Sequence, residues 1–387
     1  MKIKVLVNAS TLVIGGGIQI GASFIEYFDK NPSNSFEFFY LVSKEIYKNL
    51  SDEIKLRTAI EVIDSSPAKI FLGKQSRKKL IEIESKYKPD IVYSLGFPSY
   101  VRFSAIEIGR YTNPWEIFPA KLAWSLLKYK EKILVWMKTQ YRIIWAKNID
   151  YYETQTHSAK IAISDTLVVP KEKVQVIPNS INEIFLKNIS TKINIDMTSK
   201  FNVFCLGAPH IHKNFTCIPK IAKELSKFDI KRPFTFLLTL PEESEIWKDI
   251  HKESIQLDVN KFIHNIGPIK LKSCLYWYKS SSMVFIPTVL EVFSATYLEA
   301  MAMQKPIMTS DLDFAREICG NAAIYVKPNS YNSIAKEIYC LMNDKLGQEE
   351  LIINGLNQLK QFPSLNQKYD SLLIWFKEIY NMKSSNK

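Results

Sequence analysis

The sequence predicts an α/β fold made of two successive halves, each a parallel β-sheet with helices on both faces. Short apolar runs that read as strands alternate with helical patterns along most of the 387 residues, and this alternation is typical of parallel sheets with crossover helices. The length suits two domains better than one. We place the first domain at residues 1–182, the second at 183–362 and a C-terminal helix at 363–387.

The first half begins with an alternating strand that ends near Asn8. The glycines Gly15, Gly16 and Gly17 follow it and precede a helical pattern from Ile18 to Phe28, as expected for a strand, a loop and a helix. The second strand ends at Ser43-Lys44. Three later runs read as strands, the last of them ending in a proline turn: residues 89–94, 150–154 and 174–180.

The second half repeats this organisation and ends in a long helical pattern. Apolar runs that read as strands lie at residues 201–207, 234–238, 262–263, 283–286 and 306–309. The tail from 366 to 382 has helical spacing. On one side of that helix lie Tyr369, Leu372, Leu373, Phe376 and Tyr380.

Composition places the chain among ordinary globular proteins. Hydrophobic residues make up 47% and charged residues 23%, so an intrinsically disordered chain is excluded. The five cysteines form no CxxC pair, which argues against a disulfide framework or a zinc site and favours a reducing cytoplasm. No apolar run approaches the roughly 18 residues that cross a bilayer, and the N-terminus does not resemble a signal peptide. We therefore expect a cytoplasmic protein without a transmembrane segment.

Residues 288–302 carry two glutamates around a predicted helix start. The apolar run 282–287 ends in proline and reads as a buried strand followed by a turn, so the order is strand, loop, helix. Glu291 then lies in the loop and Glu299 within the helix. With a helical rise of about 1.5 Å per residue their separation is on the order of 10 Å, which suits a diphosphate with a sugar at each end.

The start of this helix also predicts an anion-binding site. Ser294 is a favourable N-cap residue. The amides of Ala295, Thr296 and Tyr297 would then point outward without partners, where the helix dipole favours negative charge. A single glutamate on a helix is usually a solvated residue, so the surrounding motifs must give the pair its meaning.

Residues 288–302 resemble the signature of glycosyltransferase family 4, whose pattern is a Glu, a Gly-Phe-Gly-like turn and a second Glu before Ala-Met-Ala. Further segments match the family's motifs in the right order, and the resemblance covers most of the chain. These segments are Gly207 to Asn214 with its Lys213-Asn214 pair, Phe262 to Pro268, and Asp313 to Glu317 with its Arg316-Glu317 pair.

The resemblance implies the GT-B fold, in which two Rossmann-like domains face each other across a cleft and a C-terminal helix crosses back to the first domain. It implies a retaining, metal-independent transferase that moves a hexose or similar sugar from a nucleotide-diphosphate sugar to an acceptor glycan. The acceptor would be a lipid-linked or surface polysaccharide, such as lipopolysaccharide or capsule. The second domain would bind the donor, the first would bind the acceptor, and no cofactor would be needed.

The family's site residues carry over onto matching positions. Lys213 would stabilise the leaving diphosphate, Glu291 would lie near the transferred sugar and the reacting centre, and Glu299 would accept both ribose hydroxyls. The turn departs from the pattern, with Val292 and Ser294 where glycines are frequent, which leaves the sugar open. The other donor-binding positions are Ser294, Ala295, Thr296, Gly207, His210 and His212.

The phosphate clamp lacks its usual second cation. Ala208 stands where the family commonly has an arginine. His210 and His212 are the nearest substitutes, and a structural role is the alternative for each of them. Which of the two, if either, replaces the arginine is open.

Two further motifs bear on cofactors. Gly15, Gly16 and Gly17 would let the backbone approach the donor phosphate or the acceptor, and a plain flexible turn is the alternative. Without a GxGxxG pattern, and with Ser43-Lys44 in place of an acidic residue, a nicotinamide site is not indicated. The segment Asp311-Leu312-Asp313 imitates the DxD metal motif of the other glycosyltransferase fold, but it follows the glutamate pair, so we expect no bound metal.

The net charge of +12 requires an anionic partner, and half of it lies in residues 121–147, which contain seven basic side chains and one acidic one. We expect one of two arrangements. The segment is a basic amphipathic helix on the inner face of the cytoplasmic membrane, or it is a surface helix whose apolar side packs on the first sheet. On a helical wheel Leu126, Ile133, Met137, Tyr141 and Ile144 oppose Lys121, Lys128, Lys132 and Arg142.

Other functions remain open at this stage. A nucleotide-sugar epimerase or a phosphorylase could use the same two-domain plan, and either would act on the sugar without an acceptor glycan. A non-catalytic protein could use its basic face to bind nucleic acid, although residues 121–147 contain no recognisable nucleic-acid motif. We therefore expect no nucleic-acid partner.

Overall fold

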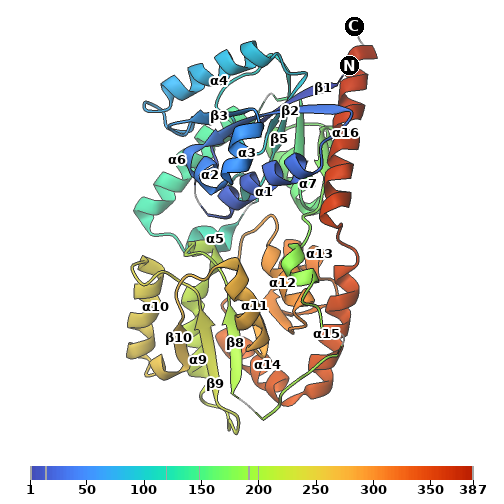
Figure 1. The fold of residues 1–387 in the computed structure, drawn as a ribbon. Coiled ribbons are helices and arrows are strands. Elements are labelled where there is room, and N and C mark those ends of the chain that lie inside the picture. The colour runs from blue at the N-terminus through green and yellow to red at the C-terminus, as the bar shows by residue number, and fades with distance from the viewer. Residues whose placement is uncertain are drawn as a thin grey trace. The chain divides into compact units, whose positions relative to one another are not determined.

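The computed structural model describes residues 2–13, 15–118, 120–147, 149–190, 192–198 and 200–385. The chain divides into two compact units, each with its own parallel sheet (Figure 1). Unit 1 takes its residues from 1–117, 133–177 and 369–387, and unit 2 takes them from 118–132 and 178–368.

The sheet of unit 1 has seven parallel strands in the order β3-β2-β1-β4-β5-β6-β7. Val5 in β1 lies opposite Phe38 of β2 and Ile91 of β4, so the strand order reverses at β1. Ligands of open α/β sheets bind outside the carboxyl ends of the strands at such a point. The strands are β1 (Ile3–Ala9), β2 (Phe36–Ser43), β3 (Ile60–Ile63), β4 (Ile91–Ser94), β5 (Ile106–Arg110), β6 (Tyr151–Thr154) and β7 (Val174–Val176).

Helices cover both faces of this sheet because alternate side chains of each strand point to opposite sides. The buried side chains of Leu6, Leu41 and Val92 form one cluster with Leu80 and Ile83 of α4. The opposite face is covered by α1 and α16. The helices in unit 1 are α1 (Gly16–Lys30), α2 (Lys44–Asn49), α3 (Asp52–Arg57), α4 (Lys74–Tyr87), most of α6 (Tyr129–Ala146), α7 (His157–Leu167) and α16 (Leu365–Ser385) from Tyr369 onward.

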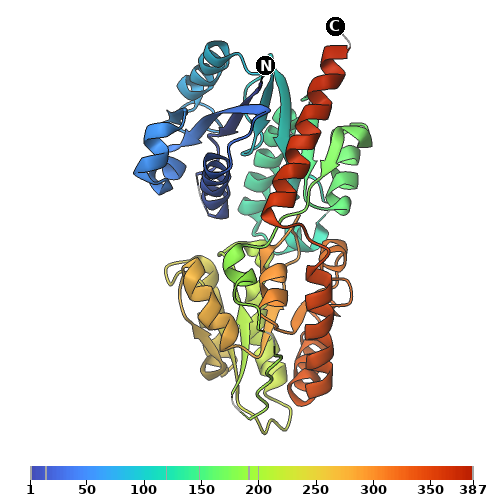
Figure 2. The same ribbon diagram turned by 45° about the vertical axis from the view of Figure 1, so that its right-hand side comes forward.

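The C-terminal helix α16 packs on unit 1, as the amphipathic pattern at 366–382 predicts (Figures 1 and 2). The Tyr369 ring lies 5.3 Å from that of Phe24 and 5.2 Å from that of Phe28, both in α1. The Phe376 ring lies 5.2 Å from that of Tyr93 in β4. Such aromatic contacts bury large apolar areas, so the last helix contributes a substantial part of this core.

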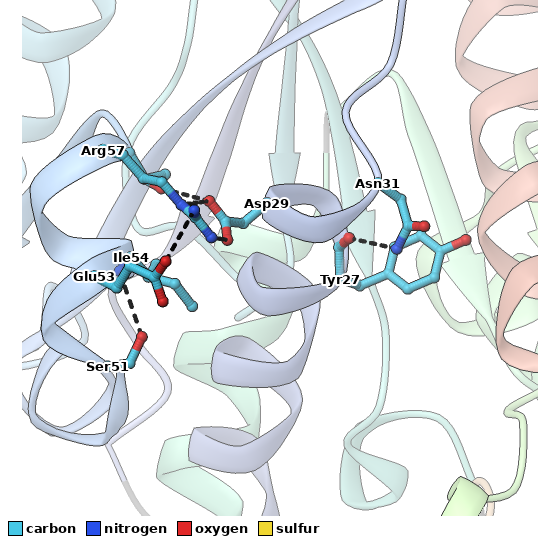
Figure 3. Close-up of polar contacts among 8 residues, drawn as sticks. Tyr27, Asp29, Asn31, Ser51, Glu53, Ile54 and Arg57 are labelled. Atoms are coloured by element: carbon cyan, nitrogen blue, oxygen red, sulfur yellow. Dashed lines mark hydrogen bonds and ion pairs between the residues drawn. The ribbon is translucent and has the colours of Figure 1, made fainter.

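The end of α1 is fixed by ionic and capping contacts (Figure 3). Arg57, the last residue of α3, holds Asp29 through two bonds, Nε to Oδ1 at 2.8 Å and Nη2 to Oδ2 at 2.5 Å. The bonds from Arg57 lower the pKa of Asp29. The Ser51 hydroxyl accepts from the Ile54 amide at the start of α3, and the Asn31 side chain donates to Tyr27 O at the end of α1. The bonds to Asp29 and Tyr27 thus fix α1 at the end opposite its glycines, and the Ser51 bond caps the helix that carries Arg57.

The sheet of unit 2 has six parallel strands in the order β10-β9-β8-β11-β12-β13. Val203 of β8 lies opposite Phe236 of β9 and Met283 of β11, so this sheet reverses its strand order at β8. Its carboxyl edge next to β8 and β11 is therefore the expected ligand position. The strands are β8 (Phe201–Cys205), β9 (Phe234–Leu238), β10 (Ile263–Asn265), β11 (Met283–Ile286), β12 (Ile307–Ser310) and β13 (Ala323–Val326).

Two buried clusters occupy the faces of this sheet. Val203 and Phe285 pack with α9 and α14, whereas Phe204 and Val284 pack with α11, α12 and α13. The helices in unit 2 are α5 (Lys121–Ser125), α8 (Glu183–Leu186), α9 (Ile218–Leu225), α10 (Glu245–Gln256), α11 (Leu271–Lys279), α12 (Ala295–Ala302), α13 (Asp313–Cys319), α14 (Tyr331–Asn343) and α15 (Lys345–Leu359). Within the described ranges, no helix is long and apolar enough to cross a membrane.

Candidate functional site

The loops that follow β8 and β11 are joined by hydrogen bonds at the carboxyl edge of the unit 2 sheet. The Val289 amide donates to His212 O at 2.8 Å, and the Thr288 hydroxyl donates to the same carbonyl at 3.1 Å. Because β8 and β11 are adjacent parallel strands, their carboxyl ends meet at one edge. These bonds fix the positions of Lys213 and Glu291, which come from the two loops.

Lys213 and Glu291 form an ion pair through Nζ and Oε1. The lysine side chain is 16% exposed and the glutamate side chain 13% exposed, so both charges have lost most of their water. Taking two charges out of water costs free energy that their attraction only partly returns. An anionic ligand that reaches Lys213 can therefore compete with Glu291 for the ammonium group.

Gly207 and Asn214 shape the loop around this lysine. A Cβ at Gly207 would lie 2.9 Å from Cζ of Phe215 and 3.8 Å from Cδ of Lys213, so any larger residue would have to push the Phe215 ring aside. Asn214 has a φ of 57°, a left-handed conformation that asparagine tolerates better than most residues. Its side-chain amide donates to Asn329 Oδ1 at 3.2 Å. The Lys213-Asn214 pair is thus a charged residue followed by the residue that turns the chain.

His210 and His212 lie next to the lysine as a stacked pair. Their ring centroids are 5.4 Å apart and their planes differ by 8°. Burial, and then the charge of Lys213, lowers the pKa of both rings, and the pKa of His212 falls to about 3. Both rings are therefore neutral at neutral pH. They can donate a hydrogen bond from one nitrogen, but they do not supply the second positive charge that an arginine would.

Helix α12 begins where the sequence predicts, but its first turn differs in two respects. Ser294 is the N-cap residue, yet its side chain makes no capping hydrogen bond. The predicted N-cap position of Ser294 is confirmed, but the amide of Tyr297 bonds to the Ser294 carbonyl at 3.3 Å, so the prediction of a free Tyr297 amide is wrong. In this tightened first turn the Tyr297 amide bonds to the backbone carbonyl of Ser294 and not to its hydroxyl. Ala295 and Thr296 are the first helical residues, whose amides have no preceding turn to bond to.

Glu299 of α12 is held by a tyrosine that sequence analysis missed. The Tyr278 hydroxyl, on α11, donates to Glu299 Oε2 at 2.8 Å. Burial raises the pKa of Glu299, and the bond from Tyr278 opposes that rise. The Tyr278 side chain is fully buried and packs edge-on against Phe204. Nothing in the spacing of the chain marks Tyr278 as different from a core tyrosine, because its partner lies on another helix.

Gly15, Gly16 and Gly17 lie in unit 1 at the start of α1. Gly15 has a φ of +61°, which favours glycine, and a Cβ at Gly15 or Gly16 would meet no atom within 4 Å. At Gly17 a Cβ would lie 3.1 Å from Cδ2 of Leu12. The backbone at the first two glycines is thus uncovered by side chains, as contact with a ligand would require.

The acidic residues of the DxD-like segment have other contacts. Asp311 Oδ1 accepts from Arg316 Nε at 2.6 Å, and the Arg316 guanidinium lies 4.4 Å from the centre of the Tyr325 ring. Asp313 is the first residue of α13. Across the part of the chain that the structure describes, no three or more His, Cys, Asp or Glu side chains gather so as to hold a metal ion.

A cavity of about 410 Å³ lies at the amino edge of the unit 1 sheet, beside residues that precede β4 and β5. Two of its carboxylates are already occupied: Glu84 accepts from the amides of Ser104 and Ala105, and Asp90 accepts from that of Lys4. Parallel sheets bind ligands at their carboxyl ends. We therefore assign the candidate site to the loops after β8 and β11.

Two parallel α/β sheets, each with its strand order reversed at an inner strand, and a last helix that packs on the first unit define the GT-B fold. Solved structures agree along nearly the whole chain. A glycosyltransferase from Rickettsia africae aligns with a TM-score of 0.66 at 16% identity and covers 100% of both chains. Anabaena HepE in complex with UDP aligns with a TM-score of 0.68 at 14% identity and covers 98% of this chain and 100% of that one.

Sequence comparison finds similarity to one family over part of the chain. Residues 202–344 match the family model described as glycosyl transferases group 1. The O-antigen chain mannosyltransferase RfbU of Salmonella typhimurium is 27% identical over 199 residues. That match covers 50% of this chain and 52% of RfbU, so the chain spans about half the length of this curated relative. The predicted fold is confirmed, and the match over residues 202–344 agrees with the predicted family.

Proposed function

We propose that the protein is a retaining glycosyltransferase that moves a hexose from a nucleotide-diphosphate sugar to an acceptor glycan. The observation that carries this proposal is the convergence of Lys213, Glu291 and the first turn of α12 at the carboxyl edge of the unit 2 sheet. One cation, uncapped amides and two carboxylates within one unit match a ligand that has both phosphate and hydroxyl groups. The family match over 202–344 supports the same assignment.

The donor would engage this site in a way that separates the ion pair. The diphosphate takes the Lys213 ammonium and the amides of Ala295 and Thr296, which oppose the charge that grows as the glycosidic bond breaks. Glu291, released from the lysine, accepts from hydroxyls of the transferred sugar. Glu299, already oriented by Tyr278, accepts from the ribose hydroxyls. His210 and His212, as uncharged rings, donate hydrogen bonds to the phosphate oxygens.

The acceptor would bind unit 1, whose Gly15–Gly17 loop leaves backbone uncovered by side chains. We propose a lipid-linked or surface polysaccharide as the acceptor class, and the relative RfbU, described as an O-antigen chain mannosyltransferase, supports it. The HepE structure that contains UDP supports a uridine donor as one to test first. No metal takes part in the proposed reaction, because Lys213 and the helix start supply the positive field.

A panel of nucleotide sugars tests this proposal directly. The melting temperature of the protein is measured with UDP-, GDP-, ADP- and dTDP-sugars, because a ligand that binds the folded form raises it. The donor that stabilises the wild type is expected to have no effect on the Lys213→Ala/Glu299→Ala variant. The anomeric configuration of the transferred sugar is then read by NMR with an oligosaccharide or lipid-linked acceptor, and retention is expected.

Three outcomes would contradict the proposal. Inversion at the anomeric carbon would exclude the retaining mechanism. Conversion of the sugar nucleotide without any acceptor would indicate an epimerase, and phosphate-dependent release of a sugar phosphate would indicate a phosphorylase. Equal stabilisation of the wild type and the double variant would place the donor elsewhere.

A further inference from the structure

The outer face of α6 exposes a row of large apolar side chains. Tyr129, Ile133, Trp136, Met137 and Ile144 recur at the spacing of one helical face, and their exposed fractions are 79%, 44%, 57%, 48% and 64%. Scattered exposed apolar residues are common on protein surfaces, but a continuous row marks an interaction site. This finding differs from one of the two expected arrangements, in which the apolar side of the segment packs on the first sheet.

The inner face of α6 is attached to unit 1 by polar bonds and by aromatic contacts of Tyr141 and Trp145 with Tyr100. Arg142 pairs with the buried carboxylate of Glu116, and its Nη2 donates to Phe97 O at 2.9 Å. Thr139 and Ala146 are buried on the same side. Arg142 lies opposite the apolar row, as the helical wheel predicts, but its guanidinium faces unit 1 and pairs with Glu116 instead of belonging to a basic surface. Because this side of α6 faces unit 1, the apolar row on the other side faces solvent.

Exposed lysines border the apolar row. Lys130 and Lys138 lie on α6, and Lys128 lies just before it, all three exposed. The acid in the first turn, Glu131, accepts from the backbone amide of Lys128 at 2.7 Å. The segment from Lys121 is also not one helix, since Leu126 closes α5 before α6 begins. The result is a helix about 27 Å long by its rise with an apolar outer face and cationic edges.

We propose that α6 is a docking surface for an anionic lipid bilayer, on which it lies flat. A surface of this composition inserts its apolar side chains to the level of the headgroups while its lysines meet anionic lipid. Trp136 and Tyr129 suit the headgroup level, where amphipathic rings accumulate. Nucleic acid fits the face less well, because aliphatic side chains such as Ile133, Met137 and Ile144 cannot stack on bases as aromatic ones do.

This proposal does not depend on the proposed transferase activity. Sedimentation of the full chain with vesicles of phosphatidylcholine and phosphatidylglycerol, compared with phosphatidylcholine alone, tests it. We expect binding to the anionic vesicles and much weaker binding to the neutral ones. Each lysine near an anionic surface is worth about a fivefold factor in partitioning, so Lys130→Gln/Lys138→Gln should reduce binding roughly 25-fold.

Matched controls separate this face from general effects of charge and hydrophobicity. Lys171→Gln/Lys173→Gln removes the same charge from another exposed segment and should leave binding unchanged. Trp136→Glu/Ile144→Glu should abolish binding. The control Ile255→Glu/Ile353→Glu alters residues that are 56% and 49% exposed in unit 2 and should retain it. Far-UV circular dichroism and melting temperature establish that each variant is folded.

Several results would overturn the proposal. Equal losses in the α6 variants and their controls would show that the face is not specific. Undiminished binding after the Trp136→Glu/Ile144→Glu change would exclude insertion. Failure of the wild type to bind anionic vesicles, together with salt-dependent retention on DNA that the lysine variant loses, would assign the face to nucleic acid.

Discussion

Lys213 and Glu291 satisfy each other when no ligand competes for them, and this governs how a donor must bind. Both side chains are mostly buried, so neither can lose its partner without gaining another. A diphosphate supplies a stronger partner for the lysine than one carboxylate does, and sugar hydroxyls supply donors for the glutamate. The ion pair therefore keeps the two groups in position for a ligand with both chemistries.

Replacing either member of this pair should reduce turnover at a saturating donor concentration. Lys213→Ala removes the cation that opposes charge on the leaving diphosphate, and we expect kcat to fall by about 10²- to 10³-fold, as for other single electrostatic donors. Glu291→Ala should also reduce kcat severely, because the reacting sugar loses its positioning carboxylate. Steady-state kinetics at saturating donor measures both effects.

The control for these variants is the exposed pair Lys248–Glu245, with Nζ and Oε1 2.7 Å apart. Lys248→Ala removes a comparable contact from the surface of the same unit, and an exposed pair contributes little. Its kinetics should match the wild type. Near-normal kcat in both Lys213→Ala and Glu291→Ala would refute the assignment of the site.

Tyr278 should control the pH range in which Glu299 binds the donor. In the proposed site Glu299 would accept ribose hydroxyls as a carboxylate, and its pKa is raised by burial, so donor affinity should fall as pH is lowered through that pKa. The Tyr278 bond lowers the pKa. Tyr278→Phe should therefore shift the loss of affinity to higher pH and weaken binding by about 10- to 150-fold, since a bond to a charged group is worth about 1.5–3 kcal/mol.

Isothermal calorimetry of donor binding across a pH series measures this shift. Tyr339→Phe is a suitable control, because that hydroxyl donates to Asp229 O on the exposed surface of the same unit. A pH profile of Tyr278→Phe that coincides with the wild type would show that Tyr278 has a packing role alone.

At the scale of elements, parallel pairing places the functional loops. The carboxyl ends of β8 and β11 are neighbours, and the loops after them supply Lys213 and Glu291, which are 78 residues apart in sequence. Helix α16 has a comparable role in unit 1. Its inner side chains meet α1, β2 and β4, so the last residues of the chain complete a core that the first residues begin.

The contribution of α16 can be measured at Phe376, which is fully buried. Phe376→Ala should lower the free energy of unfolding of unit 1 by about 3–5 kcal/mol, the range for loss of a buried aromatic side chain. Ile374→Ala, at a position that is 60% exposed on the same helix, should change it by less than about 0.5 kcal/mol. Urea unfolding followed by fluorescence gives both values, and equal effects would argue against a structural role for α16.

At the scale of the whole molecule, two units with separate cores divide the labour that we propose. Unit 2 has the donor chemistry, and unit 1 has the glycine loop and the exposed face of α6. The domain borders at residues 182 and 362 remain predictions. The net charge of +12 is also unevenly distributed along the chain, since half of it lies in residues 121–147 around α5 and α6.

The protein should catalyse sugar transfer without a divalent metal. Asp311 is engaged by Arg316, and Lys213 and the start of α12 provide positive field where the diphosphate would bind, so a metal is not required for charge neutralisation. Transfer rates measured with an excess of chelator should equal those without it. Activity that is lost with chelator and restored by Mg²⁺ or Mn²⁺ would contradict this prediction.

The sequence by itself determined the parts that depend on local pattern. Apolar runs predicted β9 and β11 with the bounds that the structure has, because buried parallel strands are short apolar segments between turns. Helical spacing predicted α16, and the motif around Glu291 and Glu299 predicted the fold and the family. Strands β3, β5 and β13 were not predicted.

Tertiary structure decided what depends on partners far along the chain. The Tyr278 bond to Glu299, the Lys213–Glu291 pair, the neutral state of the two histidines and the outward row on α6 all follow from burial or from contacts between separate elements. Periodicity gives the apolar side of a helix but not the direction in which it faces. In α6 the Arg142–Glu116 pair lies on the side that faces unit 1, where a buried carboxylate needs a partner, and the apolar row lies on the exposed side.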